Sequence, residues 1–139
     1  MKKQKLFLLS LAVCLILSAC GGGGGGDSSS STATPVNATG AWSGPYNSSV
    51  FGAQTVTLNI MQTGSTVSGT YSSSTGGLGS ISGSMDGDTA KVIIAVTTPG
   101  CSGSFNTTCI VTGNQMSFGY SGSSTCGGNE SGTGNLTKQ

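Results

Sequence analysis

The chain has 139 residues, enough for one domain at most, and Gly, Ser and Thr make up close to half of it. It contains no His and no Arg, which removes the commonest general base, the commonest metal ligand and the guanidinium fork that binds phosphates. Three of its five Lys precede residue 6, so the rest of the chain has two Lys against four acidic residues. Nucleic-acid binding needs clustered Lys and Arg, so the composition argues against a nucleic-acid partner.

The first twenty residues have the pattern of an export signal. The early Lys residues precede an apolar stretch over residues 6–17, which is too short to cross a bilayer as a helix. It ends in Leu17-Ser18-Ala19-Cys20, which resembles the lipobox of bacterial lipoproteins. The resemblance implies a signal peptide over residues 1–19 and a lipid on Cys20 that anchors the protein to a membrane. Because Gly21 is not Asp, it also implies the outer membrane of the cell envelope, with a Gram-positive cell surface as the alternative.

Residues 20–39 are expected to join this lipidated Cys to the rest of the chain. Six consecutive Gly are followed by one Asp and four Ser. Such a composition cannot form a core, so we expect a flexible tether that holds a folded domain away from the lipid.

Residues 40–138 are predicted to form an all-β domain. No stretch has helical periodicity, and short alternating segments rich in Val, Ile, Thr and Tyr are separated by Gly, Asn, Asp and Ser. Asp86-Gly87 is typical of a tight hairpin turn, and Gly64-Ser65 and Gly113-Asn114 also suit such turns. We therefore predict a meander of eight strands, over residues 41–47, 54–62, 66–72, 78–85, 89–97, 103–112, 115–121 and 128–137.

An internal repeat supports the count of eight. Thr63-Gly64 and Tyr71-Ser72 recur with the same spacing as Thr112-Gly113 and Tyr120-Ser121. A unit of four strands that occurs twice accounts for both the spacing and the number of strands.

The predicted strands have one apolar face and one face rich in Ser, Thr, Asn and Gln. The apolar positions alternate along each strand and are Trp42, Tyr46, Val56, Leu58, Ile60, Val67, Tyr71, Ile81, Met85, Val92, Ile94, Val96, Phe105, Cys109, Val111, Met116, Phe118, Tyr120 and Leu136. Eight antiparallel strands bury such a face when they close into an up-and-down barrel, which also removes the sheet edges. A two-sheet β-sandwich is the alternative fold.

The first predicted strand opens with Gly40-Ala41-Trp42, which resembles the Gly-x-Trp start of calycin barrels, the group of lipocalins and avidins. Residues 64–71 are also similar to the second hairpin of avidin-type barrels. The resemblance implies a barrel in which a basic residue near the last strand crosses the Trp, and Lys138 is the candidate. Avidins bind biotin through several Trp residues, and this chain has one, so biotin binding is not expected.

Three cysteines remain after the predicted signal peptide and anchor. An exported domain meets oxidising conditions, so we expect a disulfide. The loops that hold Cys101 and Cys126 lie at the same end of a meander, whereas Cys109 lies about 20 Å along a strand at an inward-facing position. We therefore predict a Cys101–Cys126 bond, worth about 3 kcal/mol in the chain-entropy view, and a buried free thiol at Cys109.

Candidate contacts for a ligand or partner are the inward-facing aromatic residues, one loop aromatic residue and one acid. They are Trp42, Tyr46, Phe51, Tyr71, Phe118, Tyr120 and Glu130. No His is present to activate a Ser, and the Cys spacing does not fit zinc, so we expect neither an enzyme nor a metal or cofactor site.

These observations favour a lipid-anchored envelope protein that acts as a structural or interaction module. A calycin-like carrier of a small apolar ligand is the alternative. An unfilled barrel interior would favour the carrier, and a filled interior would favour the module. In either case we expect binding at the end remote from the tether, where the connections near residues 48–53, 73–77, 98–102 and 122–127 are longer.

Overall fold

The computed structural model describes residues 34–139, so the predicted signal peptide, Cys20 and the tether as far as residue 33 lie outside the described residues. Residues 34–139 contain eight strands: β1 (Gly40–Ser48), β2 (Gly52–Thr63), β3 (Thr66–Ser73), β4 (Leu78–Asp86), β5 (Thr89–Thr98), β6 (Cys101–Thr112), β7 (Gln115–Ser124) and β8 (Gly128–Lys138). Every predicted strand is found, and each extends slightly further than the sequence pattern indicates. Within the described residues no helix is long and apolar enough to span a membrane.

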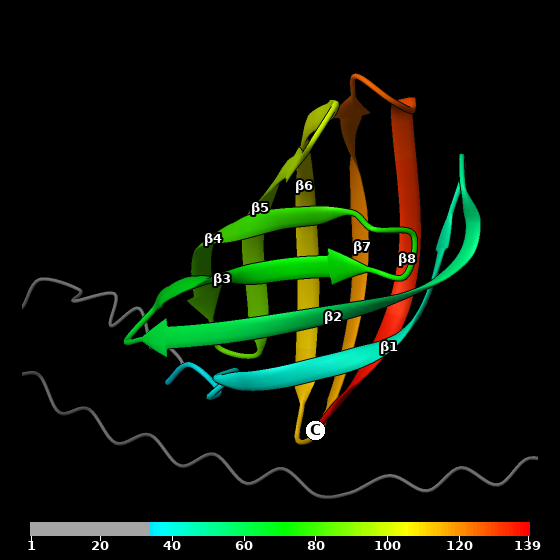
Figure 1. Cartoon of the computed structure of the whole chain (residues 1–139). Helices are drawn as coiled ribbons and strands as arrows, with labels where there is room; N and C mark the ends of the chain where they lie inside the picture. The colour runs from blue at the N-terminus through cyan, green and yellow to red at the C-terminus, as the bar shows by residue number, and fades with distance from the viewer. Residues whose placement is uncertain (1–33) are drawn as a thin grey trace, which may run out of the picture. The chain divides into compact units, whose positions relative to one another are not determined.

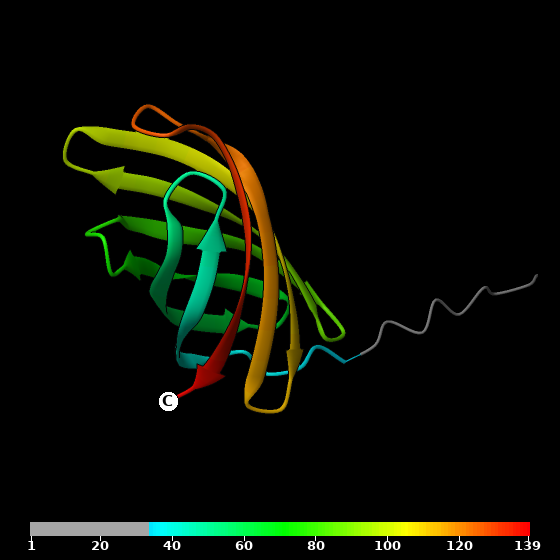
Figure 2. The same ribbon diagram turned by 90° about the vertical axis from the view of Figure 1, so that its right-hand side faces the viewer.

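The strands form a closed antiparallel barrel in which each strand pairs with its neighbours in sequence (Figures 1 and 2). The barrel closes where β1 pairs with β8, from Trp42 opposite Lys138 to Ser48 opposite Gly132. This confirms the predicted up-and-down barrel and excludes the two-sheet sandwich, because β1 and β8 leave no free edge. The repeat seen in the sequence relates β2, β3 and β4 to β6, β7 and β8.

The two ends of the barrel differ, and we name them the turn end and the loop end. At the turn end, two-residue turns join β2 to β3, β4 to β5 and β6 to β7, and Gly64, Gly87 and Gly113 occupy the positive-φ positions that L-residues disfavour. Residues 49–51, 74–77, 99–100 and 125–127 make the connections at the loop end. The connection at 99–100 is shorter than predicted, because β5 and β6 stay paired as far as Thr98 and Cys101.

The turn end is densely packed. Its largest fully buried side chains are Trp42, Met116, Leu136, Val67 and Val111. The indole Nε1 of Trp42 donates a hydrogen bond of 2.8 Å to the carbonyl of Ala38, and Lys138 Nζ lies 5.4 Å from the centroid of the Trp42 ring. Lys138 therefore crosses the Trp as the resemblance to calycin barrels implies.

Residues just before β1 also pack against the turn end. The amide of Val36 donates to the carbonyl of Gly87, and the amide of Ala38 donates to Gln62 Oε1 at 2.7 Å. Ala38 is buried, and Figure 2 shows the segment running past the barrel end close to the C-terminus. These contacts begin within the range that the sequence assigns to the tether, because backbone hydrogen bonds and one buried methyl group hold a segment whose composition favours coil.

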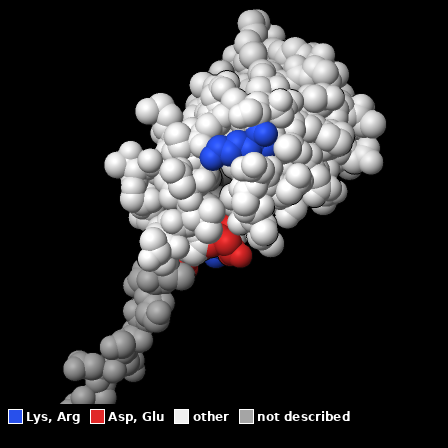
Figure 3. Space-filling view, turned by 90° about the horizontal axis from the view of Figure 1, so that it is seen from below, with Lys and Arg blue, Asp and Glu red and all other residues white. Residues whose placement is uncertain are grey.

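The outer surface of the barrel is polar but has few charges. Lys91 lies near the start of β5, and its side chain is exposed on the outer surface. Most of the face seen in Figure 3 consists of uncharged side chains. Exposed apolar side chains such as Met61, Ile93 and Ile110 occur singly among Ser, Thr and Asn on the strands.

Candidate ligand-binding cavity

The interior of the barrel contains a cavity of about 290 Å³. Its deeper wall is apolar and includes Leu58, Ile81, Val92 and Met116, all of them buried. Inward-facing side chains nearer the loop end are only partly buried, among them Ile94, Val96 and Phe118, and loop residues such as Phe51 and Thr75 also line the cavity. The cavity therefore extends from the packed side chains of the turn end, such as Met116, to the loop end, and we call its opening there the mouth.

Four aromatic rings form one wall of the cavity. The centroid of Tyr120 lies 5.6 Å from that of Phe105, 6.1 Å from that of Tyr46 and 6.3 Å from that of Phe118. Two of these rings depend on glycines in β8. A Cβ at Gly132 would lie 2.5 Å from Tyr120 Cε1, and one at Gly134 would lie 2.6 Å from Phe118 Cε1. Small residues on β8 therefore let the rings of β7 lie across the neighbouring strand.

A carboxylate is held at the mouth by hydroxyl groups. Glu130 Oε1 accepts hydrogen bonds of 2.7 Å from both Tyr120 Oη and Ser48 Oγ. Ser48 Oγ in turn accepts from the backbone amides of Val50 and Phe51, which fixes the β1–β2 loop next to the acid. Burial raises the pKa of Tyr120 above its ordinary value, and the bond to Glu130 also raises it, so the phenol stays protonated and donates to the carboxylate.

An amide is held on the adjacent wall. Gln54 Oε1 accepts hydrogen bonds from the hydroxyl of Tyr46 and from Thr75 Oγ1, the latter at 2.8 Å. Burial raises the pKa of Tyr46, so this phenol too remains a donor. Within the described residues Gln54 Nε2 and Thr107 Oγ1 are the buried side-chain polar atoms without a hydrogen-bond partner, and both residues line the cavity.

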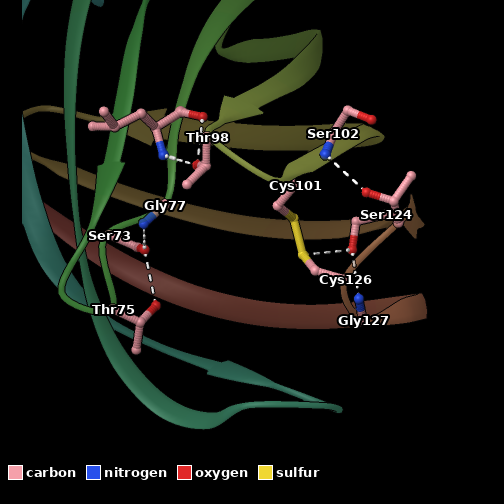
Figure 4. The surroundings of a disulfide bond; sticks show 11 residues. Ser73, Thr75, Gly77, Thr98, Cys101, Ser102, Ser124, Cys126 and Gly127 are labelled. Carbon is pink, nitrogen blue, oxygen red and sulfur yellow. Dashed lines mark hydrogen bonds between the residues drawn. A yellow bond between two sulfur atoms is a disulfide. The ribbon is translucent and has the colours of Figure 1, made fainter.

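A disulfide joins Cys101 at the start of β6 to Cys126 in the β7–β8 connection, with a Cα–Cα distance of 5.4 Å (Figure 4). The pairing predicted from the meander is confirmed. Both cysteines line the mouth of the cavity, and the hydroxyl of Ser124 lies 3.5 Å from Cys126 Sγ. The disulfide therefore ties the start of β6 to the β7–β8 connection at the edge of the opening.

Cys109 is a free, buried thiol on the cavity wall, as the sequence predicts. Its burial raises its pKa to about 12, so the thiol is protonated at neutral pH. A protonated buried thiol is a poor nucleophile and acts here as a small apolar wall group.

The structure brings most of the predicted contact residues together. Tyr46, Phe51, Tyr71, Phe118, Tyr120 and Glu130 all line the cavity. Trp42 does not: it is fully buried in the packing of the turn end. Cys20 lies outside the described residues.

Sequence reasoning missed the polar lining residues Gln54 and Thr107. Both have the inward-facing alternation, since Gln54 precedes Val56 by two positions and Thr107 lies between Phe105 and Cys109. The same alternation identifies them as inward-facing, although their side chains are polar. A polar residue at one of the alternate, otherwise apolar positions of a barrel strand is thus the sequence signal for a polar group inside the barrel.

The lining can hold an apolar molecule and form a few directed hydrogen bonds with it. In the part of the chain that the structure describes, no three His, Cys, Asp or Glu residues gather as metal ligands would. In comparisons with known proteins, no family model and no curated protein matches this chain.

Proposed function

We propose that this domain binds a small, mainly apolar molecule inside its barrel and acts as a lipid-anchored carrier or receptor in the cell envelope. The observation that carries the proposal is the apolar cavity of about 290 Å³ that reaches the mouth. Protein interiors are normally close-packed, so a barrel whose side chains leave an open apolar cavity, near the lower end of the usual size range for ligand pockets, is suited to a binding role. The lipobox at Cys20 supports the anchor, with the outer membrane as the proposed location.

The experiment uses neighbouring residues of β5 that face opposite ways. Ile94 lines the cavity, whereas Ile93 is exposed on the outer surface. Binding of the fluorescent apolar probe N-phenylnaphthylamine is measured for the wild type and for Ile94→Trp and Ile93→Trp. Native mass spectrometry of the purified wild type identifies any molecule that copurifies.

We expect Ile94→Trp to abolish probe binding because the indole fills the cavity, and Ile93→Trp to leave binding unchanged. Circular dichroism shows whether both variants keep the fold. Equal effects of the two substitutions, or no binding by the wild type, would contradict a binding site inside the barrel.

A structural or interaction module is the second candidate, and exposed apolar side chains at the loop end favour it. Val50 and Phe51 lie in the β1–β2 connection, and Leu78 begins β4. Exposed apolar groups on loops held by a rigid barrel are typical of a protein contact surface. An epitope inserted at Gly76 of the loop end should impair partner binding, while one at Gly87 of the turn end should preserve it. Equal effects would contradict a loop-end interface.

A further inference from the structure

Two polar groups inside the cavity have no partner among the described residues. Gln54 is 7% exposed and Thr107 is 4% exposed, yet Gln54 Nε2 and Thr107 Oγ1 make no hydrogen bond. Buried polar atoms in proteins are nearly always paired, because an unpaired one loses its bonds to water without replacement. Both residues line the same cavity, so an occupant of that cavity is the natural partner for both.

The unpaired state of Gln54 does not depend on which way its amide is oriented. The hydroxyls of Tyr46 and Thr75 both contact the same amide atom. Exchanging the oxygen and nitrogen positions of the amide would let the nitrogen donate to these hydroxyls but would leave the oxygen unpaired. A free amide nitrogen can donate to a hydroxyl or a carbonyl group, a free amide oxygen can accept from a hydroxyl group, and so a hydroxyl group suits either orientation.

The charges around the cavity select against an acid. Among the described residues that line the cavity none is Lys, Arg or His, and the one carboxylate among them is that of Glu130 at the mouth. Lys138 lies over the Trp42 ring at the turn end, and Lys91 is exposed on the outer surface. A carboxylate in this cavity would lose its hydration, lack a cationic partner and face a like charge.

We propose that the ligand is an uncharged amphiphile: an apolar molecule without a free acid, whose neutral hydroxyl or carbonyl groups bond to Thr107 and to Gln54. The inference rests on the proposed binding function and specifies its ligand class. It follows from two observations: two neutral polar groups in the cavity have no partner, and no described residue of the lining is a cation. Thr107→Val tests whether the hydroxyl of Thr107 binds the ligand or only supports the fold, because the substitution keeps the shape of the side chain and removes the hydroxyl.

The experiment uses the purified mature protein and displacement of N-phenylnaphthylamine by decanol and by decanoate at pH 8, where decanoate is ionised. Three variants are compared with the wild type. Thr107→Val removes the orphan hydroxyl, and Thr108→Val is the matched control at an exposed position of the same strand. Glu130→Gln removes the carboxylate at the mouth.

We expect decanol to displace the probe from the wild type at a concentration at least tenfold lower than decanoate does. In Glu130→Gln, the ratio of the two displacing concentrations should be smaller, because the like charge at the mouth is gone. Thr107→Val should weaken decanol binding about fivefold, the equivalent of one hydrogen bond, while Thr108→Val leaves it unchanged. Thr107→Val should also raise the melting temperature of the empty protein, because it removes a buried hydroxyl that has no partner.

Decanoate binding as tightly as decanol would overturn the proposal, as would a Thr107→Val protein with unchanged decanol affinity. A fall in the melting temperature of Thr107→Val would show that the hydroxyl has a structural partner, and would also overturn it. If the probe does not bind the wild type at all, the proposed binding function itself fails, and this result is distinct from the others.

Discussion

Loss of the disulfide should lower the stability of the barrel by an amount that its position allows us to estimate. Cys101 and Cys126 are 25 residues apart, and their bond closes a loop that contains β6 and β7. In the chain-entropy view, closing a loop of this length in the unfolded state is worth about 3 kcal/mol. For a domain of about a hundred residues, this corresponds to a fall in melting temperature of roughly 10–20 °C.

The assay is thermal unfolding followed by circular dichroism, with and without a reductant. The double variant Cys101→Ser, Cys126→Ser should melt at the same temperature as the reduced wild type, and reductant should not change it further. Cys109→Ala is the matched control, because it removes a cysteine and keeps the bond. Reductant should therefore lower the melting temperature of Cys109→Ala by as much as it lowers that of the wild type.

Two results would refute this reasoning. If the oxidised and the reduced wild type had the same melting temperature, the closure of the loop would contribute nothing to stability. A cross-linked peptide containing Cys109 in non-reducing peptide mapping would show that the strand arrangement is wrong, because Cys109 and the mouth lie far apart along β6.

Three other predictions concern the core and the anchor. Burial raises the pKa of Cys109 from near 9 to about 12, so the contribution of the protonated thiol to the free energy of unfolding is fully present below pH 9 and is lost as the pH rises towards 12. In urea titrations at increasing alkaline pH, the free energy of unfolding should therefore fall less steeply for Cys109→Ala than for the wild type. Trp42→Phe should cost about 1–3 kcal/mol in urea unfolding, because it leaves the carbonyl of Ala38 without its donor; an unchanged midpoint would contradict a role for that bond. Cys20→Ser should abolish labelling of the protein by a metabolic fatty acid, and labelling that persists would contradict lipidation at this residue.

Local patterns in the sequence determined the strands and their faces. A strand exposes alternate residues to opposite sides, so the spacing of Val56, Leu58 and Ile60 was enough to identify an inward face. Turn dipeptides such as Gly64-Ser65 and Gly113-Asn114 marked the tight turns, and the structure has both glycines at positive φ. Because the order of strands in a meander follows the order of the chain, the same reasoning brought Cys101 and Cys126 together.

The apolar face of eight strands predicted a closed barrel, but the register in which β1 meets β8 and the cavity were decided by the tertiary structure. No local pattern in β1 or β8 specifies how the two pair, because the contact joins segments at opposite ends of the domain. The cavity is a difference between the space that eight strands enclose and the volume of the side chains inside it, and residues such as Gly132 and Gly134 set this difference through the rings that cross them. The isolation of Gln54 Nε2 and Thr107 Oγ1 likewise depends on which groups the closed barrel places within reach, and the sequence alone does not contain those distances.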